Sequence, residues 1–301
     1  MATRKRAPAA PPWMEESGKA ARIGKTALMT LLALVVLLPF ASIIAVSLSS
    51  YRDVAGGGLT LFPRHPTLAA YRVIFAGDIV AHALWVSIGV TLVGTAVNMF
   101  MTVTMAYGLS RPSVPGSRLV LVLVLGTLLF SAGLIPNYLV VRQLGLIDTY
   151  GSLVLPGAIS AFNLVVLRQF FMGLPAELVE GARIDGASDL WILLRIVLPL
   201  SKPVLAVVAL FYGVAHWNDF FAATLYLNDA HKWPIQLVLR QYVLQGGALA
   251  NAVASDPNQS PPPAQTIQMA VVVIGTAPIL IVYPFLQRHF TRGVLTGAIK
   301  G

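Results

Sequence analysis

Long stretches without a charged residue constrain this sequence more than any other feature. No residue is charged between Lys25 and Arg52 or between Asp78 and Arg111. A helix needs roughly 20 apolar residues to cross the hydrocarbon core of a bilayer, and both stretches exceed that length. Only 11% of the residues are charged and the mean hydropathy is +0.76, a balance far from that of soluble proteins. The sequence therefore predicts an integral membrane protein.

Charged residues mark the ends of six expected spans. The apolar stretches predict membrane helices over residues 26–46, 84–107, 119–141, 149–167, 203–227 and 267–286, the fifth of which has to accommodate Asp219. The expected fold is all-α and polytopic, with one transmembrane domain over residues 25–301. Residues 1–24 are rich in Ala, Pro, Lys and Arg and are expected to form a disordered basic tail near anionic lipid.

The distribution of Lys and Arg predicts the orientation of these spans. With a cytoplasmic N-terminus, only six of the 21 basic residues lie outside, namely Arg52, Arg64, Arg72, Arg142, Lys232 and Arg240. Basic residues are enriched on the cytoplasmic side of membrane proteins, so both termini are expected there, in the plasma or inner membrane. A cleaved signal peptide is the alternative, but the first apolar run is too long and no small-residue cleavage site closes it.

The composition also excludes several kinds of chemistry. Cysteine is absent, which rules out disulfides and a thiol nucleophile. We find no cluster of His and carboxylates with metal-ligand spacing, no Gly-rich phosphate loop and no catalytic residue, so the chain is not expected to bind a metal or to hydrolyse ATP itself. The net charge of +9 comes from basic residues between apolar runs, which argues against a nucleic-acid partner.

One expected cytoplasmic loop, residues 169–202, has features of two short helices. Pro175 suits the first helical position, and Gly186 readily takes the left-handed conformation that ends a helix. Ser188 is a good cap for a second helix, with Asp189 near its positive end, and Pro199 is expected to end it about three turns later. The sequence thus predicts two helices joined at a glycine elbow.

The same loop carries a recognisable signature. Permeases of ABC importers have a cytoplasmic motif of Glu-Ala-Ala, three residues, Gly, nine residues, Ile, one residue and Leu-Pro. This chain has Glu180, Gly181, Ala182, Gly186, Ile196, Leu198 and Pro199 at that spacing, with Gly181 as the one departure. The sequences around Asp185, Ile196 and His216, together with the ending Gly297-Ala-Ile-Lys-Gly301, resemble the carbohydrate-uptake branch that includes the maltose permease subunits. Within it, residues 25–301 are most similar to the group for lipoproteins, aldouronates and complex oligosaccharides.

This resemblance implies the type I importer fold and a set of partners. A second, similar permease would complete the translocation path, two ATPase subunits would bind ATP and grip the elbow, and an extracytoplasmic binding protein would deliver a sugar. Glu180 would contact the ATPase or orient its helix, Gly186 would be the hinge, and Arg183 and Asp185 would be rim contacts. The expected coupling residues are Glu180, Gly181, Ala182, Arg183, Asp185, Gly186, Ala187, Ile196, Leu198 and Pro199. The tail at Gly297, Lys300 and Gly301 would reach the ATPase as well, unless it is simply a frayed terminus.

Polar and aromatic residues inside the spans suggest where a sugar passes. Polar side chains in a membrane tend to face a cavity or a partner, and sugars bind against aromatic faces. We expect Asn163, Trp217, Asn218 and Phe220 to line the path, with Asn98, His216, Asp219 and Tyr226 as weaker candidates. Trp217 and Asn218 could instead pack helices or bind a freed backbone group.

Three other classes remain open at this point. A secondary transporter would be expected to show inverted repeats and intramembrane carboxylates, of which only Asp219 is present. A channel or simple membrane anchor would not need the elbow signature. A permease for a solute other than a sugar would share it.

Overall fold

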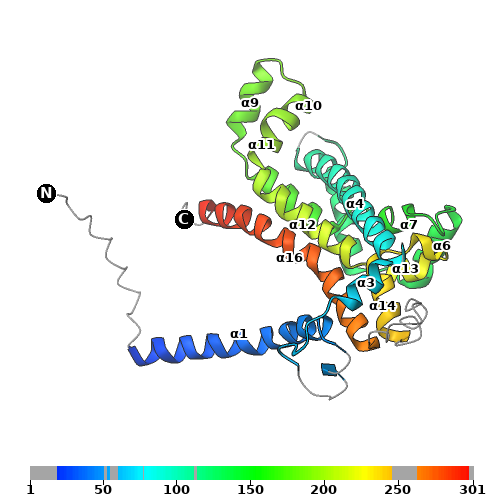
Figure 1. Ribbon diagram of the computed structural model, residues 1–301. Helices are drawn as coiled ribbons and strands as arrows, with labels where there is room; N and C mark the ends of the chain where they lie inside the picture. Colours follow the sequence, from blue (N-terminus) through cyan, green and yellow to red (C-terminus); the bar gives the residue numbers. More distant parts are fainter. Residues whose placement is uncertain are drawn as a thin grey trace.

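The computed structural model describes residues 19–50, 53–54, 60–76, 78–111, 114–245 and 263–297, and its architecture is helical throughout these ranges (Figure 1). Their one β-type contact is an isolated bridge between Ser49 and Pro66. The prediction of an all-α fold is confirmed. The helices are α1 (Lys19–Ser47), α3 (Ala69–Ala76), α4 (Asp78–Ser110), α5 (Ser117–Leu129), α6 (Leu134–Gln143), α7 (Gly151–Val154), α8 (Ala161–Met172), α9 (Ala176–Ile184), α10 (Asp189–Ile192), the π-helical η1 (Leu193–Val197), α11 (Leu198–Leu200), α12 (Lys202–Asn218), α13 (Phe221–Tyr226), the 3₁₀ turn η2 (Ala230–Lys232), α14 (Ile235–Gln245) and α16 (Ala264–Gly297).

Helix α1 reaches away from the rest of the molecule (Figure 1). Its apolar side chains are largely exposed until the last turn, where Ala45 and Val46 are buried and the Ser47 hydroxyl lies 2.9 Å from that of Tyr71. An exposed apolar helix of this length suits lipid rather than water. A disordered tail was expected over residues 1–24, but α1 begins at Lys19, so residues 19–24 are helical instead. Residues 1–18 lie outside the described part of the chain.

Three helices are long and apolar enough to cross a membrane, over Ala20–Ser47, Asp78–Ser110 and Ala264–Val282. Two bent helix pairs raise the number to five if each pair is counted as one span, and α5 is a shorter apolar helix. The first, second and sixth predicted spans thus correspond to continuous helices. The total of six stays a prediction.

The third predicted span, residues 119–141, is wrong as a single helix. Helix α5 ends at Leu129, Phe130 is extended, and Gly133 has a φ of 83° before α6 begins. Only glycine adopts such a φ readily, so Gly133 interrupts the helix.

The fourth predicted span, residues 149–167, is also interrupted. The single turn of α7 stops before Pro156 and Gly157, and α8 begins after Ser160. A proline cannot donate to the helical ladder, and a following glycine favours a turn. The groups freed by this break find partners: Gly157 O accepts from Asn98 Nδ2 at 3.4 Å, and Ser160 N donates to the Tyr212 hydroxyl at 2.9 Å.

The fifth predicted span, residues 203–227, breaks where its one carboxylate lies. Helix α12 ends at Asn218, and Asp219 has non-helical dihedral angles. Its Oδ1 accepts the main-chain N–H of Ala222 at 3.0 Å, in the first turn of α13. Asp219 thus satisfies a free donor at a helix start, which explains its place in an apolar stretch.

The core lies along α4, which packs against α8 and α12. One buried cluster surrounds the end of α4 near Tyr107 and includes Leu164, Ile192 and Val208. A second surrounds its beginning near Val80, with Trp217 from α12 and Val271 from α16. From Val80 to Tyr107 the helix rises roughly 40 Å, so the two ends of α4 lie about a bilayer thickness apart. Two ends of the molecule are thereby defined, one carrying α9 and α10 and the other α13 and α14 (Figure 1).

Candidate functional site

Helices α9 and α10 form the predicted elbow. Gly186 has a φ of 84°, and the N–H groups of Gly186 and Ala187 donate to the carbonyls of Arg183 and Ala182 at 3.0 and 2.9 Å. This pair of bonds is the Schellman arrangement that closes a helix on a left-handed residue. The Ser188 side chain then accepts from Trp191 N at 3.3 Å and caps α10, as predicted.

The two ends of the elbow differ slightly from expectation. Pro175 precedes the first helical residue of α9 instead of occupying it. The second helix passes through the π turn η1 and ends at Leu200, one residue beyond Pro199. It then meets α12 at an angle of 86°, and Ser201 at the corner is fully buried.

The elbow is fixed to the end of α4. The Tyr107 hydroxyl donates to the main-chain carbonyl of Asp189 at 3.0 Å, and the ring is buried beside Ile192 and Val197. Arg168 on α8 donates to the carbonyl of Leu109 at 2.9 Å, which holds the neighbouring helix to the same end. Sequence reasoning missed this connection, because no spacing rule relates Tyr107 to a carbonyl 82 residues away.

An ion pair bridges the two helices of the elbow. Arg183 Nη2 lies 3.0 Å from Asp189 Oδ1, with both side chains partly exposed. The hydrogen bond to Asp189 raises the pKa of Arg183 above its usual value, so the guanidinium stays charged. An exposed pair contributes little to stability, so this one adds only a weak link between α9 and α10.

The signature residues divide into two groups. Glu180, Arg183, Asp185, Gly186 and Pro199 are exposed, and so is Gly181. Ala182, Ala187, Ile196 and Leu198 instead pack against the buried cluster at the end of α4. One group can therefore contact another protein while the other attaches the elbow to the spans.

A groove runs between the two helices of the elbow. Its volume is about 690 Å³, and it is lined by Leu178, Ala182, Asp185, Gly186, Ala187, Ser188, Trp191 and Ile196. Nearby apolar side chains are strongly exposed, with Ile184 at 86% and Leu190 at 64%. Large apolar side chains gathered on a polar loop are typical of a protein interaction surface.

The four expected path residues do not come together as one site. Trp217 is buried between helices and donates through Nε1 to the carbonyl of Gly275 at 3.0 Å. Asn218 Nδ2 donates to Val214 O, one turn back in its own helix. These contacts match the alternative of helix packing and backbone bonding. Asn163 is buried in α8, while Phe220, at the break after α12, is 41% exposed.

A buried polar seam joins α4 to α12. His216 Nε2 lies 3.0 Å from Asn98 Nδ2, and Thr102 Oγ1 lies 2.6 Å from the Tyr212 hydroxyl. The two helices approach closely there, since a Cβ added to Gly94 would lie 2.7 Å from the His216 ring. The weaker path candidates Asn98 and His216 therefore hold helices together.

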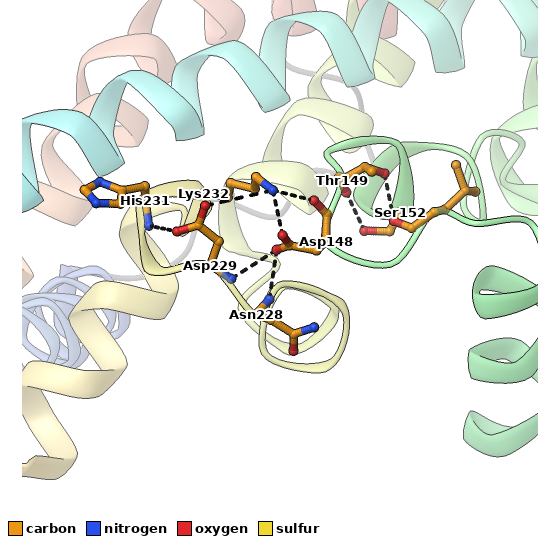
Figure 2. Close-up of polar contacts among 8 residues, drawn as sticks. Asp148, Thr149, Ser152, Asn228, Asp229, His231 and Lys232 are labelled. Carbon is orange, nitrogen blue, oxygen red and sulfur yellow. Dashed lines mark hydrogen bonds and ion pairs between the residues drawn. The ribbon is translucent and has the colours of Figure 1, made fainter.

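A second polar cluster lies at the opposite end of α4 (Figure 2). Asp148 Oδ1 accepts the N–H groups of Asn228 and Asp229 at 3.0 Å, and its Oδ2 lies 2.6 Å from Lys232 Nζ. Its own N–H donates to Tyr226 O at 2.8 Å. The Lys232 hydrogen bond holds the pKa of Asp148 below its usual value, and Asp148 in turn raises the pKa of Lys232. This cluster ties the α6–α7 turn to the segment after α13.

Two remaining expectations concern the C-terminal tail and metal binding. Lys300 and Gly301 of the expected contact tail lie outside the described residues, and Gly297 is the last residue of α16. Within the described ranges, no three His, Asp or Glu side chains are grouped so that they could share a metal ion.

Comparison with known proteins places these features in a family. Residues 86–296 match the family described as the binding-protein-dependent transport system inner membrane component. The chain is 48% identical over 273 residues to a polygalacturonan/rhamnogalacturonan transport system permease protein of Bacillus subtilis, covering 91% of this chain and 96% of the relative.

Two solved structures resemble the fold. One is a bacterial ABC transporter involved in the import of the acidic polysaccharide alginate, with a TM-score of 0.86, 30% identity, and coverage of 93% of this chain and 100% of the other. A second is the alginate ABC transporter in complex with a periplasmic protein bound to an alginate pentasaccharide, with a TM-score of 0.56. At 15% identity and 90% and 94% coverage, that second likeness shows the fold alone.

Proposed function

The chain belongs to the family of binding-protein-dependent transport system inner membrane components, and from this membership we propose that it forms half of the path for an oligosaccharide and couples that path to a separate ATPase. Members of this family are multi-pass permease components of ABC importers and not enzymes. ATP would be bound by the partner subunit.

The observation that carries the coupling role is the shape of the elbow. The two exposed helices meet at a glycine in the left-handed conformation, and a groove runs between them. Together they offer a compact surface to a partner. The partly buried half of the same motif packs against the cluster formed by α4, α8 and α12 and attaches that surface to the spans. A force on the exposed half would therefore be transmitted to the membrane helices through packed side chains.

The partners follow from this arrangement. A second, similar permease would face this chain across the path, and two ATPase subunits would each bind one elbow. An extracytoplasmic binding protein would dock at the other end, near the Asp148 cluster; support comes from the alginate transporter that was solved in complex with its periplasmic protein. The elbow and both termini would then be cytoplasmic, which agrees with the excess of Lys and Arg on that side.

The substrate is proposed to be a sugar or oligosaccharide. Support comes from the similar proteins, one a permease of a polygalacturonan/rhamnogalacturonan transport system and one an importer of alginate. Among the residues expected to line the path, Phe220 keeps an exposed aromatic ring at the break in the fifth span, and Asn163 remains a candidate from α8.

A bulky residue at Gly186 tests the coupling role. Apart from the neighbours in the chain, no described residue has an atom within 4 Å of a Cβ built there, so the side chain of Gly186→Leu would enter the space that the proposal assigns to a partner. We expect normal abundance in the membrane, loss of co-purification with the ATPase and loss of uptake. Gly145→Leu is the matched control, because Gly145 also has a positive φ, of 68°, and open surroundings. Normal uptake by Gly186→Leu would contradict the proposal.

The C-terminal tail is proposed as a second contact with the ATPase. Helix α16 runs to Gly297, which would leave Lys300 and Gly301 close to its end. Deleting residues 297–301 should lower the ATPase activity stimulated by the loaded binding protein. Unchanged stimulation would show that the tail is a frayed terminus.

A further inference from the structure

Two cations on the segment that follows α13 have opposite environments. Lys232 is neutralised by Asp148 at 2.6 Å and has Asp229 at 3.9 Å. Arg240, in the middle of α14, forms no ion pair with any carboxylate in the described ranges. Among the described residues, one cation thus has a counter-charge and the other has none.

Neutral groups hold the Arg240 guanidinium in place. Its central carbon lies 5.1 Å from the centre of the Phe220 ring, and Nη1 donates to Thr224 Oγ1 at 3.3 Å. A guanidinium stacked on an aromatic ring stays charged and keeps its donors in a fixed fork. Of its five N–H donors, only one bonds another described residue, Thr224, which leaves a fork for an external acceptor.

The place of Arg240 connects this fork to the path. Phe220 and Thr224 belong to the interrupted fifth span, on either side of the start of α13. Irregular backbone at membrane depth occurs where it is buried in protein or lines a water-filled cavity. Phe220 and Phe221 are 41% and 53% exposed, so this break lies at the surface of the chain and is free to face the path.

We propose that Arg240, held by Phe220 and Thr224 at the break in the fifth span, binds the carboxylate of an acidic sugar during transport and makes the path selective for uronate-containing oligosaccharides. This inference rests on the proposed function and narrows its substrate class. A guanidinium fork matches a carboxylate with two parallel, charge-assisted hydrogen bonds, which are stronger than those that the hydroxyls of a neutral sugar accept. Arg240 is then a specificity residue for this half of the path.

An anionic lipid headgroup is the competing ligand for an arginine near a membrane surface. The contacts favour the sugar, because both groups that hold Arg240 come from the interrupted fifth span. The guanidinium lies over the ring of Phe220, which is the residue at the break itself. A lipid ligand would make the effect of the mutation depend on the lipid composition. A sugar ligand makes it depend on the charge of the substrate.

The test uses the complete importer in proteoliposomes of zwitterionic lipid, with its binding protein saturated by oligogalacturonate or by the methyl-esterified form. We expect Arg240→Gln to lower kcat/KM for the acid about tenfold, as fits the loss of a charged hydrogen bond, with little change for the ester. Arg240→Lys should be intermediate. Arg142→Gln, which removes an exposed cation on α6, should behave as wild type.

Three results would overturn the inference. They are wild-type uptake of the acid by Arg240→Gln, an equal fall for acid and ester, and an effect that appears only when anionic lipid is present. Assembly of the importer and its ATPase rate with unliganded binding protein show whether the variant is intact. If the wild-type importer carries neither substrate nor any other oligosaccharide, the proposed function itself fails, and that outcome is separate from a defect limited to Arg240.

Discussion

The ammonium nitrogen of Lys232 lies 2.6 Å from a carboxylate oxygen of Asp148 and 2.8 Å from its main-chain carbonyl oxygen. Asp148 has a φ of 60° and is the one non-glycine residue with a positive φ in the described part of the chain. Asp tolerates this conformation better than most residues, and the hydrogen bonds around it hold it there. A single side chain thus joins two segments 80 residues apart in the sequence.

Replacing Asp148 by Asn should lower the thermal stability of the purified chain. Asn also tolerates a positive φ and can still accept the N–H groups of Asn228 and Asp229, so the variant removes mainly the charge. We expect a lower Tm in detergent at neutral pH. Asp229→Asn is the control, since its carboxylate lies 3.9 Å from Lys232, and it should have a smaller effect.

The same pair predicts a pH dependence. The pKa of Asp148 is lowered by Lys232, so its contribution is complete above the ordinary value of 3.8 and is lost as the pH falls through the folded-state value. The pKa of Lys232 is raised, so its contribution is complete below 10.5 and is lost as the pH rises through the folded-state value. The Tm difference between wild type and Asp148→Asn should be constant between these limits and shrink in stronger acid. A difference that persists unchanged at pH 2 would contradict the ion pair.

Removing the Tyr107 hydroxyl should weaken coupling more than stability. Tyr107→Phe keeps the buried ring and loses the bond to Asp189 O, at a cost of about 1 kcal/mol in the free energy of unfolding. We expect the ATPase rate stimulated by the loaded binding protein to fall severalfold at normal assembly. Thr104→Val is the control, because the partners of Thr104 in the described part of the chain are carbonyls of its own helix. A wild-type rate for Tyr107→Phe would show that the elbow moves α4 without this bond.

Restoring alanine at Gly181 should stabilise the elbow. No atom lies within 4 Å of a Cβ at this position, and Gly within a helix costs roughly 0.5–1 kcal/mol relative to Ala. Gly181→Ala should therefore raise the Tm and retain uptake. Gly186→Ala has equally open surroundings but a φ of 84°, so it should lower the Tm by backbone strain. Equal shifts for both variants would contradict this account.

Trp217 and Asn218 should affect stability and not substrate affinity. Trp217→Phe removes the bond to Gly275 O and part of a buried ring, which should cost about 1–2 kcal/mol. Asn218→Ala loses only a bond within its own helix and should be close to neutral. The check is unfolding by denaturant together with the apparent KM for uptake. A raised KM at normal stability would restore both residues to the path.

The elbow could be predicted in detail because its signals are local. Pro175, Gly186 and Ser188 act on the backbone within a few residues, and the structure places each of them at or beside the expected helix end. The first, second and sixth spans could be predicted equally well, because each is an unbroken apolar run. The helices there needed no information from distant parts of the chain.

The interrupted spans and the long-range ties could not be predicted in the same way. A hydropathy average over a long apolar stretch does not detect a single residue that ends a helix. Such residues are Gly133, Pro156 and Asp219, which interrupt the third, fourth and fifth spans. The break in the fourth span is stabilised by Asn98 and Tyr212, which satisfy its freed backbone groups. The pairing of Asp148 with Lys232 likewise depends on tertiary contact, and Trp217 alone does not reveal whether it faces a helix or a cavity.

The corner at Ser201 determines what kind of motion the elbow can cause. Because residues 189–200 meet α12 at 86°, a shift of that helix along its own axis acts sideways on the start of α12. The far end is held by Trp217 on Gly275, so it serves as a pivot roughly 23 Å away. A sideways shift of about 3 Å would then rotate α12 by about 7°. If the elbow docks an ATPase as proposed, a push by that subunit would reach the path as a rotation of α12 and not as a translation.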